Sequence, residues 1–271
     1  MHTALNQMTV RHLDFTTFLD LARDLGCIGV EVRNDLGRPL FDGIAPETAG
    51  KMARDRGLRI LGMSEVYAFN SWDDDIRAKV ETIIAAAKAS GAETISLIPR
   101  NDGTQTGNGE RQANLRISLK EVLPMLEEAD MIALVEPLGF GRSSLRSKTE
   151  LVEVIEALDA TGRYKLVHDT FHHTLADGGP MFPEHTGIVH ISGVVDPALR
   201  VDQMEDEHRV LVDGRDRLGN IEQIRALLQA GYTGAISYEC FAPEIHALTE
   251  PFADLKASFE FIASELQAQP A

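Results

Sequence analysis

Apolar positions along the chain follow two periods, the 3.6-residue period of helices and the short continuous runs that are typical of buried strands. The two patterns alternate along the whole length, and each helical stretch adjoins a short β-branched run. This alternation predicts a parallel sheet whose strands are connected by crossover helices. The predicted strands are residues 3–5, 28–32, 58–63, 94–98, 132–135, 165–167, 188–191 and 235–238.

Residues with strong positional preferences mark where the helices begin and end. We predict helix N-caps at Asp14, Ser147 and Asn220, and Glu150 would complete a capping box with Ser147. Pro124 lies inside a helical pattern, where proline removes a backbone donor and clashes with the preceding turn. We therefore expect that helix to kink or to end early at Pro124.

The number of units and the length together indicate the fold class. Eight strand–helix units in 271 residues match the ~250 residues that are typical of a (β/α)8 barrel. No linker interrupts the alternation, so we predict one TIM-barrel domain over residues 1–271. A doubly wound open sheet is the alternative, but the first strand is not followed by G-x-G-x-x-G, and Gly139 with Gly141 is a weak substitute. Residues 101–110 and 192–219 are predicted to be long loops, which are often functional.

Composition and charge narrow the class of protein. The chain is 44% hydrophobic and 25% charged, with no apolar run long enough to span a bilayer and no segment resembling a secretory signal. Cys27 and Cys240 lie in apolar runs, where reduced, buried thiols are expected, so we predict a cytoplasmic protein. The net charge of -16 argues against binding to nucleic acid, and we expect no membrane partner.

Four late strands each end in a residue that could bind a metal ion. In a TIM barrel, the C-terminal strand ends meet at one mouth, so residues distant in sequence converge there. Three clustered carboxylates would repel one another unless a cation compensates them, and the set suits a hard or borderline divalent ion. We predict one Mn²⁺ ion, with Zn²⁺, Mg²⁺ or Co²⁺ as alternatives. The predicted ligands are Glu136, Asp169, His190 and Glu239.

Other polar or aromatic residues are predicted to face a substrate. Asn6 and Arg33, at the ends of the first two strands, could donate hydrogen bonds to substrate hydroxyls. Trp72 could cover an apolar sugar face, and Arg209 could enter the pocket from the long loop after the seventh strand.

Several sequence motifs resemble the sugar phosphate isomerase/epimerase superfamily, which has a xylose-isomerase-like barrel. The likeness covers nearly the full length of the chain. Within the superfamily, the sequence is most similar to inosose isomerases of inositol catabolism. Its motifs are Phe69-Asn70, Ala133-Leu134-Val135-Glu136, His168-Asp169-Thr170-Phe171-His172-His173, Val189-His190-Ile191, Asp206-Glu207-His208-Arg209-Val210, Gly231-Tyr232 and Ser237-Tyr238-Glu239-Cys240-Phe241-Ala242-Pro243-Glu244.

The resemblance implies metal ligation by the four strand-end residues and a role for His172, which would hydrogen-bond a substrate oxygen and help to move hydroxyl protons. Arg142 stands about where similar sugar 3-epimerases often have a second glutamate, which argues against a 3-epimerase. We also find no recognisable phosphate cradle, so an unphosphorylated substrate is expected. Barrels of this kind often form homodimers, and by this analogy we expect a homodimer.

These features predict an isomerase or epimerase of a small polyhydroxylated ketone, such as a keto-inositol or a ketose. A metal ion would stabilise the enediolate that forms when a proton leaves the carbon beside the carbonyl. Glu136 and Glu239, expected on opposite sides of the metal, could act as base and acid.

Three alternative functions remain. A dehydratase of a keto-inositol or of a dehydroshikimate-like compound would use the same ligands, because elimination also begins with removal of a proton beside a carbonyl. An apurinic endonuclease shares the fold but needs more metal ligands and a DNA-binding surface. A non-catalytic binding barrel is the third alternative.

Overall fold

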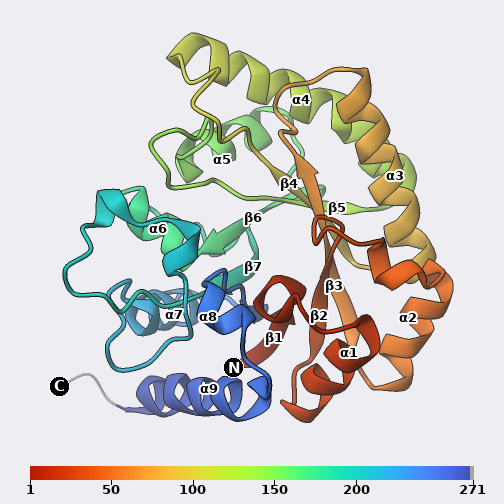
Figure 1. The fold of residues 1–271 in the computed structure, drawn as a ribbon. Helices are drawn as coiled ribbons and strands as arrows, with labels where there is room; N and C mark the ends of the chain where they lie inside the picture. The colour runs from red at the N-terminus through yellow and green to blue at the C-terminus, as the bar shows by residue number, and fades with distance from the viewer. Residues whose placement is uncertain (269–271) are drawn as a thin grey trace.

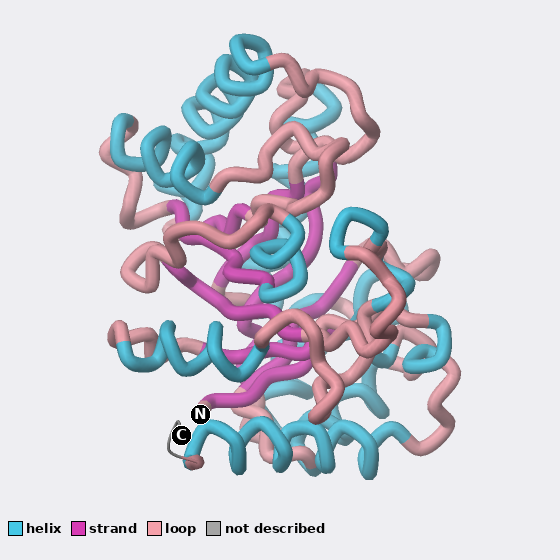
Figure 2. Tube along the Cα trace, turned by 90° about the vertical axis from the view of Figure 1, so that its left-hand side faces the viewer, coloured by secondary structure: helices cyan, strands magenta, loops and turns pink. Residues whose placement is uncertain are grey.

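The computed structural model describes residues 1–268, which form a closed barrel of parallel strands in the order β1 to β8. Strand β1 pairs with β2 on one side and with β8 on the other, which closes the sheet. Figures 1 and 2 show the strands in the middle of the molecule and the helices around them. The predicted (β/α)8 fold is therefore confirmed, and each strand overlaps its predicted range. The strands are β1 His2–Asn6, β2 Gly29–Arg33, β3 Arg59–Tyr67, β4 Thr94–Ile98, β5 Ile132–Val135, β6 Tyr164–Asp169, β7 Thr186–Ile191 and β8 Ala235–Tyr238.

Helices α1 to α7 connect successive strands, α8 and α9 follow β8, and the short 3-10 turns lie in the loops after β1, β2 and β7. The α-helices are α1 Phe15–Asp24, α2 Pro46–Asp55, α3 Asp74–Ser90, α4 Asn108–Ala129, α5 Lys148–Ala157, α6 Thr170–Leu175, α7 Asn220–Gln229, α8 Pro243–His246 and α9 Pro251–Gln267. The 3-10 turns are η1 Gln7–Val10, η2 Leu40–Gly43, η3 Val201–Gln203 and η4 Asp206–His208. None of the helices in residues 1–268 is both long and apolar enough to cross a membrane.

Two apolar layers hold the barrel together, because side chains alternate between the two faces of each strand. On β5, Ala133 and Val135 pack outward in the large core between strands and helices. Leu134, between them, packs inside the barrel with residues from β1, β3, β6, β7 and β8. Each strand is thus buried on both faces, as a parallel barrel requires.

The predicted helix starts are partly confirmed. The Asp14 side chain accepts a hydrogen bond from the Thr17 amide, and Ser147 accepts one from Glu150. The predicted cap at Asn220 is wrong, since Gly219 occupies the cap position with φ 68°. The buried Asn220 side chain instead donates to the Ser192 carbonyl, so it fixes a loop rather than the helix end.

At Pro124 the sequence predicted either a kink or an early end, and the early end is wrong because α4 continues to Ala129. Proline removes only one backbone hydrogen bond here. The buried side chains Leu119, Val122 and Leu126 stay packed on both sides of it, which keeps the helix continuous.

Candidate metal centre

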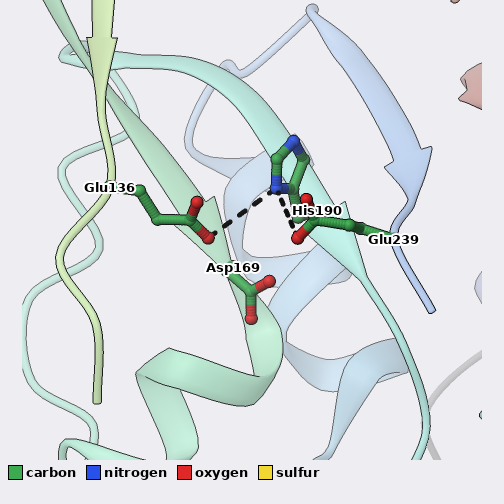
Figure 3. A group of neighbouring side chains, drawn as sticks. All are labelled: Glu136, Asp169, His190 and Glu239. Atoms are coloured by element: carbon green, nitrogen blue, oxygen red, sulfur yellow. Dashed lines mark ion pairs between the residues drawn. The ribbon is translucent and has the colours of Figure 1, made fainter. Parts of the chain in front are cut away.

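Four side chains from the ends of neighbouring strands converge at the barrel mouth, as the sequence predicted. Glu136 follows β5, Asp169 ends β6, His190 lies in β7 and Glu239 follows β8. One potential ligand atom from each of them lies within 4.8 Å of the others (Figure 3). All four are buried, and together they could hold a metal ion.

Hydrogen bonds orient His190 so that one ring nitrogen faces the carboxylates. The Nε2 atom lies 2.9 Å from Glu31 Oε2, so Nε2–H donates to that carboxylate. The Nδ1 atom lies 3.3 Å from Glu239 Oε2 and 3.7 Å from Glu136 Oε1. An imidazole that donates one N–H to a carboxylate and points its other nitrogen at a ligand cluster has the arrangement of a metal-binding histidine.

Two buried atoms in this cluster have no hydrogen-bond partner among residues 1–268, namely His190 Nδ1 and Glu136 Oε1. Buried polar atoms are normally satisfied, and leaving them unpaired is costly. A divalent cation would satisfy both atoms at once, and three carboxylates with one imidazole are donors that such an ion accepts. The residues therefore fit a metal ion.

Burial and the charges around the cluster shift the pKa values of its two glutamates in opposite directions. Burial and then the Glu239 carboxylate raise the pKa of Glu136. Burial also opposes ionisation of Glu239, but His190, Arg209 and Arg33 hold its pKa well below its ordinary value. The two glutamates thus stand in different electrostatic environments.

Two buried arginines account for part of this difference. Arg33 Nη1 donates to Glu239 Oε1 at 2.6 Å. Arg209 Nη2 donates to Asp169 Oδ2 at 2.6 Å and to Glu239 Oε2 at 3.2 Å. Glu136 has no such arginine partner in the described residues.

The loop predicted at residues 192–219 brings Arg209 into the site. A β-bridge joins Gly193, at the start of this loop, to Val210, and Arg209 Nε donates to Ser192 Oγ at 3.0 Å. The Arg209 side chain is only 1% exposed, which is unusual for an arginine in a loop. The carboxylates of the metal cluster compensate its buried charge.

A cavity of about 190 Å³ lies above the cluster and is lined mainly by polar side chains. Glu65 belongs to its wall, and burial raises the pKa of Glu65 to about 7 against the attraction of Arg33. A larger hollow of about 520 Å³ adjoins it, since both include Asp35, Glu65 and Tyr67, but that hollow does not touch the four ligands. The smaller cavity is therefore the candidate substrate site.

Only some of the residues predicted to face a substrate line this cavity. Arg33, Arg209 and His172 line the cavity. Asn6 lies below it and donates from Nδ2 to Glu239 Oε1 at 3.3 Å, so it orients a ligand instead. Trp72 is partly buried beside the Arg77 guanidinium and does not line the cavity, so the structure does not bring it to the predicted sugar-facing position.

Sequence reasoning missed Glu31, the hydrogen-bond partner of His190. A signal was present, because Glu31 is a charged residue between valines in a strand that is buried along its whole length. A carboxylate in such a place needs a partner. Only the closed barrel shows that the partner comes from β7, on the other side of the barrel.

Comparisons with known proteins agree with this architecture. The family model described as "Xylose isomerase-like TIM barrel" matches residues 19–265. No curated protein matches the chain significantly.

Solved structures of the same fold extend over nearly the whole chain. A xylose isomerase domain containing protein from Salmonella typhimurium LT2 is 27% identical, with a TM-score of 0.89, and the match covers 98% of this chain and 97% of that one. The IolI protein with a bound zinc atom is 17% identical, with a TM-score of 0.87 over 99% of this chain and 100% of that one. D-psicose 3-epimerase from Clostridium cellulolyticum H10 is 16% identical, with a TM-score of 0.76 and the same coverage.

Proposed function

Because the chain belongs to the xylose isomerase-like TIM barrel family, we propose that it is a divalent-metal-dependent isomerase or epimerase. Its substrate would be a small polyhydroxylated ketone, either a keto-inositol or a ketose. The observation that carries this proposal is the convergence of four buried side chains that could hold a metal ion, beside a small polar cavity. The zinc atom in the structurally similar IolI protein supports a metal ion in such a barrel.

A C–H bond beside a ketone is too weak an acid for a carboxylate to deprotonate unless the product is stabilised. A bound divalent ion would supply Lewis-acid stabilisation of the negative charge that develops on the substrate oxygens. We favour Mn²⁺ because carboxylates outnumber nitrogen ligands, and Zn²⁺, Mg²⁺ and Co²⁺ are the alternatives.

The two glutamates are placed to move the proton. Glu136 and Glu239 stand on opposite sides of the group in Figure 3, so a substrate between them presents one face to each. One carboxylate takes the proton from carbon, which leaves an enediolate, and a proton is then returned. Return to the neighbouring carbon isomerises the substrate, and return to the opposite face of the same carbon epimerises it.

The surrounding cationic and neutral donors would orient the substrate. Arg33 and Arg209 hold Glu239 in one position, so its oxygens cannot rotate away from the substrate. His172 is buried at the cavity wall, from where it would hydrogen-bond a substrate oxygen. These contacts fix the reacting carbon between the two carboxylates, which is how positioned groups lower a barrier.

Deuterium uptake from D2O tests the proposal. The purified protein with Mn²⁺ is incubated with keto-inositols, ketohexoses and sugar phosphates, and exchange at carbon is followed by mass spectrometry. We expect a keto-inositol or a free ketose to exchange faster than any sugar phosphate. Strong preference for a phosphorylated ketose would contradict the substrate class, and no exchange with any ketone would contradict the reaction.

Product analysis of the same samples separates isomerisation from dehydration. Isomerisation conserves mass, whereas loss of water creates an enone that absorbs ultraviolet light. A product lighter by one water molecule would show that the same site serves as a dehydratase.

A further inference from the structure

A second cavity, of about 280 Å³, lies between the start of α5 and the short helix α6. His172 belongs to the walls of both this cavity and the one above the metal cluster. The mouth is formed by exposed residues, including Arg146 and Gly178, and the interior by buried Lys148 and His173. The Lys148 residue is 9% exposed, which is rare for a lysine.

The hydrogen bonds around Lys148 fix its role as a donor. Gln223 Nε2 donates to the backbone carbonyls of Thr170 and Leu218, so its Oε1 must accept from His168 Nε2–H at 2.9 Å. The Nδ1 atom of His168 is then unprotonated and accepts from Lys148 Nζ at 2.7 Å.

His173 is the second acceptor of Lys148. Its Nδ1 lies 3.1 Å from Lys148 Nζ, while its Nε2 is on the side of Gly178, at the cavity mouth. A charged ammonium has three N–H donors, and these two imidazoles accept only two of them. The third proton of Lys148 has no acceptor among the described residues.

The wall of this cavity is rich in donors and contains no carboxylate in the described part of the chain. Arg146 donates to the carbonyls of Gly139 and Leu175, which orient its guanidinium without neutralising it. Neither Arg146 nor Lys148 forms an ion pair within residues 1–268. Because Ser147 caps α5 and Lys148 begins it, the positive end of a ten-residue helix also faces this region.

We propose that Arg146, Lys148 and His173 form a binding site for a small oxyanion, a phosphate, sulfate or carboxylate group. The oxyanion accepts the third Lys148 proton, the His173 Nε2 proton and a guanidinium proton of Arg146. Two cations that form no ion pair and two imidazoles thus lie around one cavity of an acidic chain, and an oxyanion there would compensate the positive charge. Since His172 lines both cavities, a bound oxyanion would also restrict the histidine that faces the substrate.

Isothermal titration of the metal-loaded protein with sodium sulfate tests the site. We expect one sulfate per chain, and at least about tenfold weaker binding in Lys148→Gln and in Arg146→Gln, because each removes a charged hydrogen bond. Arg215→Gln is the matched control, since Arg215 is exposed and pairs only with Asp213 within the described chain. The exposed position of Arg146 makes its variant informative even if Lys148→Gln does not fold.

A His190→Ala variant locates the bound ion. It damages the metal cluster and leaves the second cavity intact, so sulfate binding should persist whether or not the proposed reaction is correct. Absence of sulfate binding to the unchanged protein would overturn the site, as would binding that survives both Lys148→Gln and Arg146→Gln.

Kinetics distinguish the two sources of the oxyanion. If it belongs to the substrate, sulfate competes with an anionic ketone, and Lys148→Gln raises KM for that ketone alone. If it is a separate ion, sulfate changes turnover of a neutral ketone without competing with it. Both results support the site.

Discussion

Two cavities on either side of His172 have opposite electrostatic character. The cavity above the metal cluster is lined by the carboxylates of Glu136, Glu239 and Glu65. The cavity behind it gathers arginine, lysine and histidine and contains no carboxylate among the described residues that line it. One side chain therefore separates the candidate metal centre from the proposed oxyanion site.

The comparison of the two cavities shows how a barrel tolerates clusters of side chains with the same sign of charge. Burying several charges of one sign is costly unless a partner compensates them. In the metal cavity, Arg33 and Arg209 compensate part of the negative charge, yet His190 Nδ1 and Glu136 Oε1 stay unpaired. In the second cavity, two neutral imidazoles accept from Lys148 but do not neutralise it. The candidate metal ion and the proposed oxyanion would each supply the charge that these clusters lack.

The largest expected effect is on metal binding. Loss of a residue that only hydrogen-bonds a metal ligand costs about 10- to 100-fold in metal affinity. Asp169→Ala and His190→Ala should each weaken metal affinity by more than this, because each removes a direct ligand. Metal analysis of the purified variants measures the occupancy. The Lys148→Gln variant should keep one ion per chain, and unchanged occupancy in both ligand variants would refute the metal centre. Circular dichroism should show the barrel fold in all three.

The next effect separates proton transfer from metal binding. Glutamine in place of Glu136 or Glu239 keeps one coordinating oxygen but cannot accept a proton at neutral pH. Turnover at saturating Mn²⁺ should fall by roughly 10² to 10⁴-fold in each variant, as for loss of a general acid or base. If excess metal restores turnover to both variants, these glutamates are ligands only, and His172 becomes the next candidate for the base.

A smaller effect is expected at Glu31, which accepts the Nε2 proton of His190. Glu31→Leu removes the acceptor and should weaken metal affinity by about 10- to 100-fold. Glu31→Gln keeps an acceptor oxygen and should recover part of that loss. Titration with a metal-sensitive dye measures both, and equal affinity in the two variants and the unchanged protein would show that Glu31 does not orient the ligand.

The smallest effect concerns the pH dependence of the second cavity. Burial lowers the pKa of Lys148 to about 7, against the attraction of Asp169. His168 and His173, which contact it, have lowered pKa values and stay neutral. Below its pKa Lys148 carries the third proton, and above it that proton is lost. Sulfate affinity should therefore fall about tenfold between about pH 6 and about pH 8, a range in which sulfate itself does not titrate.

The Arg146→Gln variant provides the control for this pH dependence. It should bind sulfate more weakly at every pH but keep the same slope, since Lys148 still titrates. A flat profile in the unchanged protein would show that Lys148 does not supply the proton.

The secondary-structure elements and the fold class could be predicted from local sequence pattern. Apolar periodicity depends on local side-chain pattern, and this is why every strand and the positions of Glu136, Asp169, His190 and Glu239 at strand ends were predictable. The rule that C-terminal strand ends share one mouth then placed these four residues together.

The contacts of individual side chains, in contrast, could be found only in the folded barrel. Asn220 has the residue type of a helix cap, but its Oδ1 accepts from the Thr170 hydroxyl and its Nδ2 donates to the Ser192 carbonyl. Arg209 looks like an exposed loop arginine until the loop folds back over two carboxylates. Glu31 and Lys148 find their partners on other strands and helices, at sequence separations of 159 and 20 residues. Such contacts follow from closure of the barrel, because local pattern does not encode which distant residue will lie within hydrogen-bond reach.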